Sequence, residues 1–284
     1  MTTASPVTPV SAPSLPGAGR HAGFAGLLRA EWTKIRSVRS TFWTLILFVV
    51  LTVGLTAGLV ALTVANWNNT RPGTANGHLQ IILDPTAFVL GTGIFLGQLT
   101  ICVLGVLIIT TEYSSGVIRA SLLAVPKRIP MLIAKMVVFA GLLVVLAEIV
   151  AFGSFFVGSA LLHSKVAVSL SDPGVTRAVV GAGLYLTVLG LFALAIGGLI
   201  RHTAGAIATV IGIVLVLPIL SGLLPGNWGA HIDAYLPEQS GSLVYGAHPR
   251  LGALLSPWEG FGVFCLWTAV LLSLAGWLLK RRDA

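Results

Sequence analysis

The chain has 284 residues, of which 56% are hydrophobic and only 9% are charged, and its mean hydropathy is +0.95. This composition leaves too little polar surface for a water-soluble domain. The net charge of +8 would suit nucleic acid, but the Lys and Arg residues flank apolar runs and form no continuous basic face. We therefore expect an all-α integral membrane protein without a nucleic-acid partner.

The first 41 residues contain two kinds of sequence. Residues 1–19 are rich in Pro and lack the basic and apolar regions of a secretory signal, so we expect a disordered cytoplasmic tail. In residues 20–41, apolar side chains recur every three or four positions, at Phe24, Leu28, Trp32, Ile35, Val38 and Phe42. This period predicts an amphipathic helix at the membrane interface. A basic anchor before the first span is the alternative.

Residues 42–284 contain six long apolar runs, each able to cross a hydrocarbon core of about 30 Å at about 1.5 Å per residue. We expect spans at about 42–65, 87–110, 131–161, 178–200, 204–224 and 260–279. Pro218 predicts a kink in the fifth span. The glycine pairs Gly54/Gly58 and Gly93/Gly97 predict close helix packing.

The basic residues predict the orientation. Thirteen Lys and Arg residues flank one end of the six spans and four flank the other. Because basic loops stay on the cytoplasmic side, we expect both termini in the cytoplasm of a bacterium and the spans in its plasma membrane.

An outer segment between the fifth and sixth spans, residues 225–257, carries an apolar patch from Leu243 to Leu255 that is too short to span. Such a segment dips partway into the membrane or lies along the membrane surface, with its backbone covered by protein, or it is a plain surface loop.

Several kinds of chemistry have no sequence signal. The chain has no phosphate-binding loop, no His-Glu-x-x-His pair and no nucleophile elbow, and its two cysteines and six histidines lack metal-ligand spacing. We expect no catalytic residue, no metal site and no cofactor on this chain. Glu148 is the one acidic residue well inside a span, so it either lines a substrate path or packs as a hydrogen-bonded group.

The most informative segment is the charged stretch between the second and third spans, TEYSSGVIRASLLAVPKRIPMLIAK. Gly116 permits a sharp turn, Ser114 or Ser115 caps a short helix over 117–124, and Pro126 ends it. We expect a short helix parallel to the membrane. A basic cytoplasmic loop without further function explains the same charges.

This stretch, together with RAEWTKIRSVRSTFW near the start and YLPEQSG, LLSPWEG and KRRDA near the end, resembles the permease subunits of ATP-binding-cassette (ABC) exporters. The similarity is to type-two exporters of the drug and antibiotic kind and is actinobacterial in appearance. The family implies six spans, an amphipathic N-terminal helix, a coupling helix after the second span and re-entrant segments before the sixth. It assigns the contact with the ATPase to a group of loop residues: Glu112, Tyr113, Gly116, Arg119, Leu122, Pro126 and Arg128.

The resemblance also implies partners. Two separate ATPase subunits would bind ATP and Mg, and a second permease, identical or related, would complete the path through the membrane lipids. The substrate would be a lipophilic or amphipathic small molecule, a peptide or a lipid-like compound. Two other functions stay open from the residues alone: a proton-coupled secondary transporter and a membrane-embedded lipid-modifying enzyme, both using Glu148.

Overall fold

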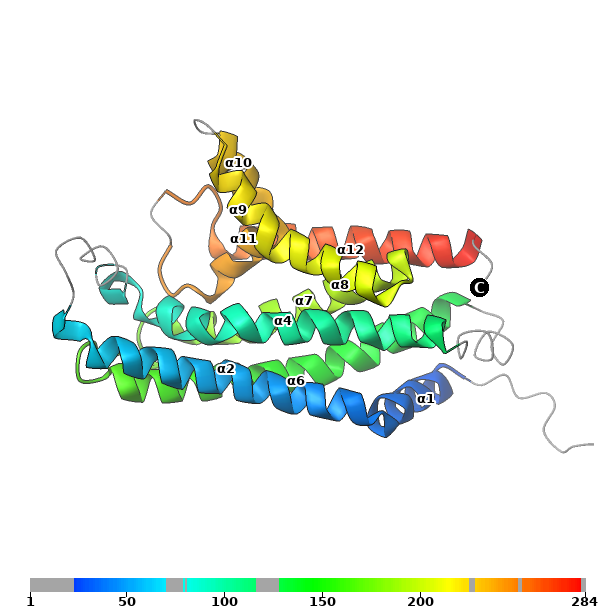
Figure 1. Ribbon diagram of the computed structural model, residues 1–284, viewed down its shortest axis with the longest axis horizontal. Coiled ribbons are helices and arrows are strands. Elements are labelled where there is room, and N and C mark those ends of the chain that lie inside the picture. The colour runs from blue at the N-terminus through cyan, green and yellow to red at the C-terminus, as the bar shows by residue number, and fades with distance from the viewer. Residues whose placement is uncertain are drawn as a thin grey trace, which may run out of the picture.

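The computed structural model describes residues 23–69, 79, 81–115, 128–224, 228–249 and 252–281. Across these residues the chain is helical and contains no strand, and the long helices form one bundle (Figure 1). Six helical segments are long and apolar enough to cross a membrane, as predicted. They are α2 (Arg39–Ala65), α4 (Pro85–Ser114), α6 (Arg128–Leu162), α7 (Val175–Ile200), α8 to α9 (Thr203–Gly222) and α12 (Pro257–Arg281).

Each of these helices begins before, or ends after, the apolar run that predicted it. The start of α4 shows why, because the polar residue Asp84 precedes the apolar run and caps the helix. Its Oδ1 accepts a hydrogen bond from the Ala87 amide at 2.9 Å, and Pro85 follows at the first helical position. We call the end of the bundle that holds Asp84 the Asp84 end. The opposite end, where α1 (Phe24–Ser37) and the last turn of α12 lie, is the α1 end (Figure 1).

The central helix of the bundle is α7, which packs against α4, α6 and α12. Its most apolar window is 78% buried, whereas that of α8 to α9 is only 17% buried. Glycines permit this close approach: a Cβ at Gly105 of α4 would meet the Gly190 carbonyl of α7, and a Cβ at Gly190 would meet Leu143 of α6.

Helices α2 and α4 cross at one of the two predicted glycine pairs. A Cβ at Gly93 or Gly97 of α4 would collide with Thr52 of α2, so this prediction is confirmed. For Gly54 and Gly58 the prediction is wrong within the described part of this chain, where nothing lies within 4 Å of a Cβ placed on either glycine. The α2 face that packs on α4 is formed by threonines instead, whose hydroxyls bond to their own helix backbone, such as Thr52 Oγ1 to Phe48 O at 2.8 Å.

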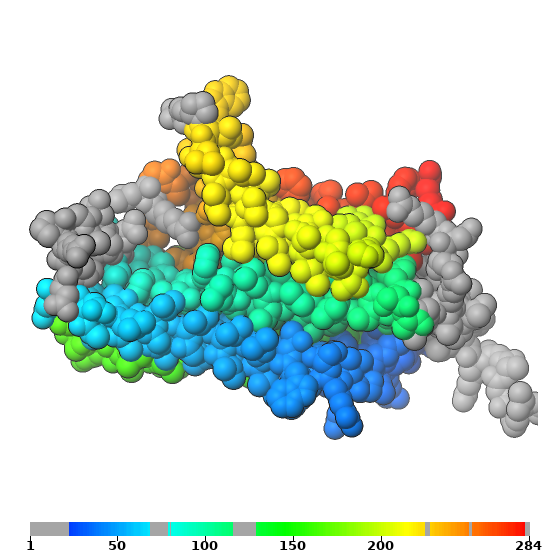
Figure 2. Space-filling view, viewed as in Figure 1, coloured from blue at the N-terminus to red at the C-terminus, as the bar shows by residue number. Residues whose placement is uncertain are grey.

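The fifth span is irregular where the kink was predicted. It consists of α8 (Thr203–Ile211), a π-helical turn η2 (Gly212–Val216) and α9 (Leu217–Gly222), and Pro218 is the second residue of α9. Because proline has no N–H to offer the carbonyl four residues earlier, the wider π turn before it is the physical consequence. In Figure 2 the α9 end of this segment projects from the bundle, whereas α8 packs against α4 and α7, and a face of α4 stays open between the segment and α2.

A segment with an exposed first helix and a buried remainder follows the fifth span, and its buried part enters the bundle near the Asp84 end. It consists of α10 (Trp228–Tyr235), α11 (Pro237–Ser242) and η3 (Leu243–Tyr245). Gly241 packs against Phe264 of α12, and the backbone of Val244 packs against Gly181 of α7. Gly181 lies six residues beyond the start of α7, which corresponds to a depth of about 9 Å.

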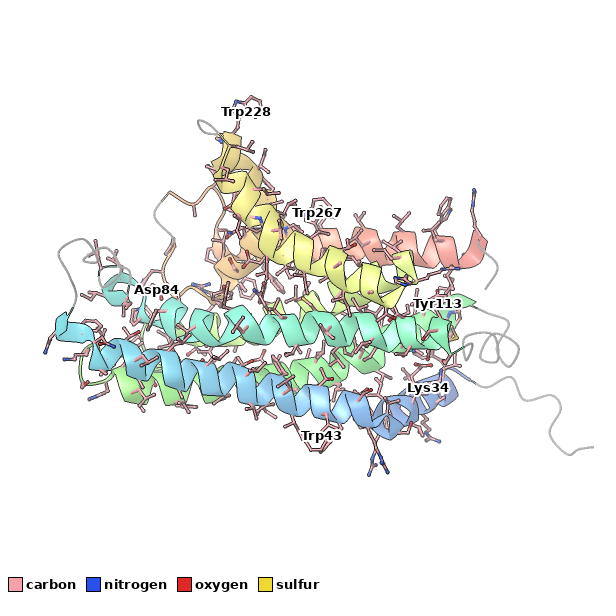
Figure 3. The ribbon with its side chains drawn as sticks, in the orientation of Figure 1. Lys34, Trp43, Asp84, Tyr113, Trp228 and Trp267 are labelled. Carbon is pink, nitrogen blue, oxygen red and sulfur yellow. The ribbon has the colours of Figure 1, made fainter. Side chains whose placement is uncertain are left out.

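Polar contacts hold this segment in place. The Arg177 guanidinium donates hydrogen bonds to the carbonyls of Val244, Gly246 and Ala247 at 3.3, 2.8 and 3.0 Å. Asp84 Oδ2 accepts a hydrogen bond from the His248 amide at 3.0 Å, and Figure 3 shows Asp84 beside this part of the chain. The alternative of a plain surface loop is therefore excluded for residues 237–247. The predicted apolar patch, Leu243 to Leu255, is displaced from the buried stretch, since Leu254 is 50% exposed.

Candidate functional site

Four charged side chains from three helices meet at the α1 end. Lys135 of α6 donates to Glu31 Oε2 of α1 at 2.6 Å and to Glu112 Oε1 of α4 at 2.8 Å. Lys34 of α1 donates to Glu31 Oε1 at 2.7 Å and to Glu112 Oε1 at 3.1 Å. We call these four residues the ion cluster. It joins the N-terminal helix to one end of the second span and to the beginning of the third.

Three members of the ion cluster are shielded from solvent. The side chains of Glu31 and Lys135 are each 4% exposed and that of Glu112 is 10% exposed, whereas that of Lys34 is 34% exposed. Charges that are shielded from solvent in this way are tolerated only when they are paired. Removing one partner leaves the other as a buried charge without compensation. The cluster therefore fixes the relative position of α1, α4 and α6.

The pKa values of the α1 members carry the same information. Burial alone would raise the pKa of Glu31, but the charges of Lys135 and Lys34 and their hydrogen bonds outweigh it and lower the pKa. Burial alone would lower the pKa of Lys34, but the hydrogen bond and charge of Glu31, with those of Glu112, raise it. Both groups are therefore held in their charged forms by the cluster.

The inward face of α1 differs from what its apolar period suggests. The buried residues of α1 are Leu27 and Glu31. Phe24, Trp32 and Val38 of the apolar stripe are exposed, at 47%, 48% and 46%. The stripe is thus free to contact lipid, and a single extended residue, Val38, separates α1 from α2. That α1 lies in the membrane interface stays a prediction.

A second set of contacts lies at the same end. The Arg201 guanidinium sits over the Tyr113 ring of α4, 4.9 Å from its centroid, and its Nη2 donates to the Leu278 carbonyl of α12 at 3.5 Å. Arg201 ends α7 with a φ of 59°, in the left-handed region that non-glycine residues seldom adopt. This one residue therefore ties the ends of α4, α7 and α12 together.

The structure places the predicted coupling residues in two groups. Glu112 and Tyr113 belong to the last turns of α4, and Arg128 is the first residue of α6. Gly116, Arg119, Leu122 and Pro126, and the predicted coupling helix itself, lie outside the described residues. The two flanks of this segment are nevertheless joined, since Glu112 precedes it and Lys135 follows it. Figure 3 shows Lys34 and Tyr113 at this same end.

Glu148, the predicted residue of a substrate path, is remote from the ion cluster. It is half-buried on α6, about 13 residues and 20 Å along the helix from Lys135. Its carboxyl group packs against Gly183 of α7, where a Cβ would collide with it. Its Oε2 has no hydrogen-bond partner among the residues that the structure describes. Within the same residues no group of three His, Cys, Asp or Glu side chains is placed to hold a metal ion.

Sequence reasoning missed three members of the ion cluster as site residues: Glu31, Lys34 and Lys135. Glu31 was the available signal, because it is the one acidic residue in a strongly basic segment. Lys34 lies one turn from Glu31 on the same helix, but Lys135 and Glu112 are distant in sequence, so no local period indicates the whole cluster.

The six apolar helices indicate a helical membrane protein of the multi-span class. No protein-family model matches the chain, and no curated protein matches it either.

Proposed function

We propose that this chain is the membrane-spanning permease subunit of an ATP-driven ABC exporter, coupled to separate ATPase subunits. The sequence of residues 111–135 and its resemblance to the coupling loops of such permeases motivate the proposal. The observation that carries it is the ion cluster, because a buried salt-bridged network joins the two ends of that same segment. A loop that only obeyed the orientation rule would need no such connection.

The mechanism follows from this connection. ATP binding closes a pair of ATPase subunits, which displaces the segment between α4 and α6. Because Glu112 and Lys135 are paired at the base of this segment, α4 and α6 move together. Glu31 also binds Lys135, so α1 moves with them. Arg201 passes the displacement of α4 to α7 and α12. A chain of such contacts transmits force only if its members change position as a unit.

The α1 end faces the cytoplasm of a bacterium, as the distribution of basic residues indicates. Two ATPase subunits bind there and carry the ATP and Mg, and a second permease, identical or related, completes the transport path. The substrate is a lipophilic or amphipathic compound, because the helices offer apolar walls and few charges.

The first test is whether an ATPase accompanies the chain. Purification of the tagged permease from its native host should recover a protein with a phosphate-binding loop, and the complex in liposomes should hydrolyse ATP. The Arg119→Glu variant should lose this partner, because a reversed charge at an interface weakens association. Recovery of the permease alone, with transport in liposomes that needs a proton gradient and no ATP, contradicts the proposal.

A proton-coupled secondary transporter is the second candidate, and Glu148 favours it. Its carboxyl group is half-buried with one oxygen lacking a partner among the described residues, as a proton-carrying group inside a span requires. In a secondary transporter, Glu148→Gln abolishes transport. In an ABC permease, the same variant leaves ATP hydrolysis unchanged and lowers the transport only of substrates that contact Glu148.

A further inference from the structure

A cavity of about 320 Å³ opens beside the ion cluster, between α1, α2 and α4. The wall formed by α4 is apolar along Leu104, Leu107 and Ile108. Toward the end of the same helix this wall becomes polar, at Thr111, Glu112 and Ser115. Such a cavity matches a ligand with a polar head and a hydrocarbon part.

The hydroxyl groups of the polar part of the wall donate their hydrogen bonds to backbone carbonyls of their own helices. Thr111 Oγ1 donates to the Leu107 carbonyl at 2.7 Å and Ser115 Oγ donates to the Thr111 carbonyl at 2.7 Å. On α2, Thr44 Oγ1 donates to the Ser40 carbonyl at 2.8 Å. A hydroxyl group that donates its one hydrogen bond can still accept others through its oxygen lone pairs. What these groups offer a ligand is therefore acceptors.

Glu112 adds the strongest acceptor. Its Oε1 accepts hydrogen bonds from the ammonium groups of Lys34 and Lys135. Its Oε2 is buried and has no hydrogen-bond partner among the described residues. The residue as a whole is 8% exposed and lines the cavity. A buried carboxylate oxygen without a donor leaves negative charge uncompensated beside the cavity, which favours a cationic ligand.

The lysines that line the cavity do not make it an anion site. Both ammonium groups donate to Glu31 and Glu112, and two positive charges face two negative ones. An anionic head would have to compete with these pairs and would also meet the free oxygen of Glu112.

We propose that this cavity is a binding site for amphiphiles with a primary ammonium head. The ammonium group donates to the hydroxyl oxygens of Thr111 and Ser115, and its charge lies next to the Glu112 carboxylate. The hydrocarbon part lies along Leu104, Leu107 and Ile108. This inference goes beyond the proposed transport function, since it concerns the permease alone and holds whatever the chain exports.

The test measures binding of radiolabelled decylammonium to the purified full-length permease in phosphatidylcholine nanodiscs, without ATPase. Decyltrimethylammonium has the same charge but no N–H, and decyl sulfate has the opposite charge. Both should bind about ten-fold or more weakly, because a charge-assisted hydrogen bond is worth at least that factor. Equal affinity of decyl sulfate or decyltrimethylammonium overturns the proposal.

Two variants of α4 form a matched pair. Leu107→Trp fills the cavity and should abolish decylammonium binding, whereas Leu96→Trp, at a position of the same helix that is 39% exposed and outside the cavity, should leave it unchanged. If both variants bind like the wild type, the ligand lies elsewhere and the proposal is wrong. An unchanged melting temperature of Leu107→Trp should show that the fold tolerates the larger side chain. Glu112→Gln should also weaken decylammonium binding.

The source of the amphiphile is distinguished by the bilayer. If phosphatidylethanolamine in the nanodisc competes with decylammonium, the native ligand is a lipid with an amine head. If it does not compete while decylammonium still binds, the ligand is a soluble amphiphile. Both results support an ammonium site, and absence of decylammonium binding in either bilayer contradicts it.

Discussion

At the scale of single residues, Glu31 and Lys135 are the pair on which the account depends. They are 104 residues apart in sequence, and their charged atoms are 2.6 Å apart. Because they come from helices on either side of two other spans, no local pattern pairs them. What the sequence does show is that Glu31 is the one acidic residue among basic ones and that Glu112 and Lys135 lie on either side of one segment.

Lys135→Met should destabilise the protein strongly. The substitution keeps the length of the side chain but leaves two buried carboxylates with only Lys34, and breaking a buried pair costs about 3–5 kcal/mol. The free energy of unfolding in mixed micelles, titrated with a denaturing detergent, measures the loss. Lys34→Met is the control and should cost clearly less, because the Lys34 side chain is one-third exposed. Equal losses in the two variants would show that burial of Lys135 contributes nothing.

The packing of α1 should depend on pH at two limits. Glu31 has a lowered pKa in the folded protein, so its contribution is present above its ordinary value of 4.5 and is lost as the pH falls through the folded value. Lys34 has a raised pKa, so its contribution is present below 10.5 and is lost as the pH rises through the folded value. Spin labels at Ala30 and Ile133, both exposed, report the separation of α1 and α6. We expect the distance between the two labels to stay constant between the two pH limits and to become longer and more broadly distributed in acid. In the Glu31→Gln variant this change in acid should be absent. A distance that changes steadily across the neutral range contradicts this assignment.

At the scale of helices, hydropathy was a sufficient guide to the spans and a poor one to their ends and faces. The six runs are all present because a long apolar segment has no alternative to a helix in a membrane. The helices extend further because capping residues such as Asp84 lie in polar sequence outside the run. The packed face of each helix was harder to predict from the sequence. The same four-residue spacing of glycines occurs in α2 and α4, but only Gly93 and Gly97 of α4 pack closely against a neighbouring helix. The buried segment around α11 was ambiguous because its polar residues and prolines are typical of surface loops.

Gly97→Ile should separate α2 from α4. A side chain at Gly97 would collide with Thr52, and overpacking of a close contact costs about 1–3 kcal/mol. Gly58→Ile is the matched control, because nothing lies near the position of its Cβ. The melting temperature of the purified permease should fall for the first variant and stay unchanged for the second. Similar falls in both would mean that the α2 and α4 contact is not determined by these glycines.

At the scale of the whole molecule, six spans bring α1 and the end of α12 to the same end of the bundle (Figure 1). The ion cluster and the contacts of Arg201 lie at that end, whereas the buried segment around α11 and its contacts with Arg177 and Asp84 lie toward the other. The molecule thus has one end tied together by charges and another tied together by hydrogen bonds to backbone groups. The proposal assigns the first end to the ATPase.

Thiol labelling tests the orientation of the two ends. In a background without Cys102 and Cys265, single cysteines at Asn68 and Ser169 should react with an impermeant reagent added to intact cells. Cysteines at Ser115 and His202 should react only after the cells are opened. All four positions are exposed, so differences in reactivity report the side of the membrane. Labelling of Ser115 in intact cells would reverse the assignment.

The most direct test of the central claim is permease-dependent ATP hydrolysis in liposomes that contain the permease and its ATPase. Lys135→Met should retain the ATPase but lose most of the stimulation, because the variant breaks the ion cluster behind the contact. Arg119→Glu should lose both. Lys280→Glu, an exposed charge reversal at the same end of the bundle, is the control and should behave like the wild type. If Lys135→Met and Arg119→Glu both retain wild-type stimulation at equal permease abundance, force does not pass through this segment and the ion cluster has only a structural role.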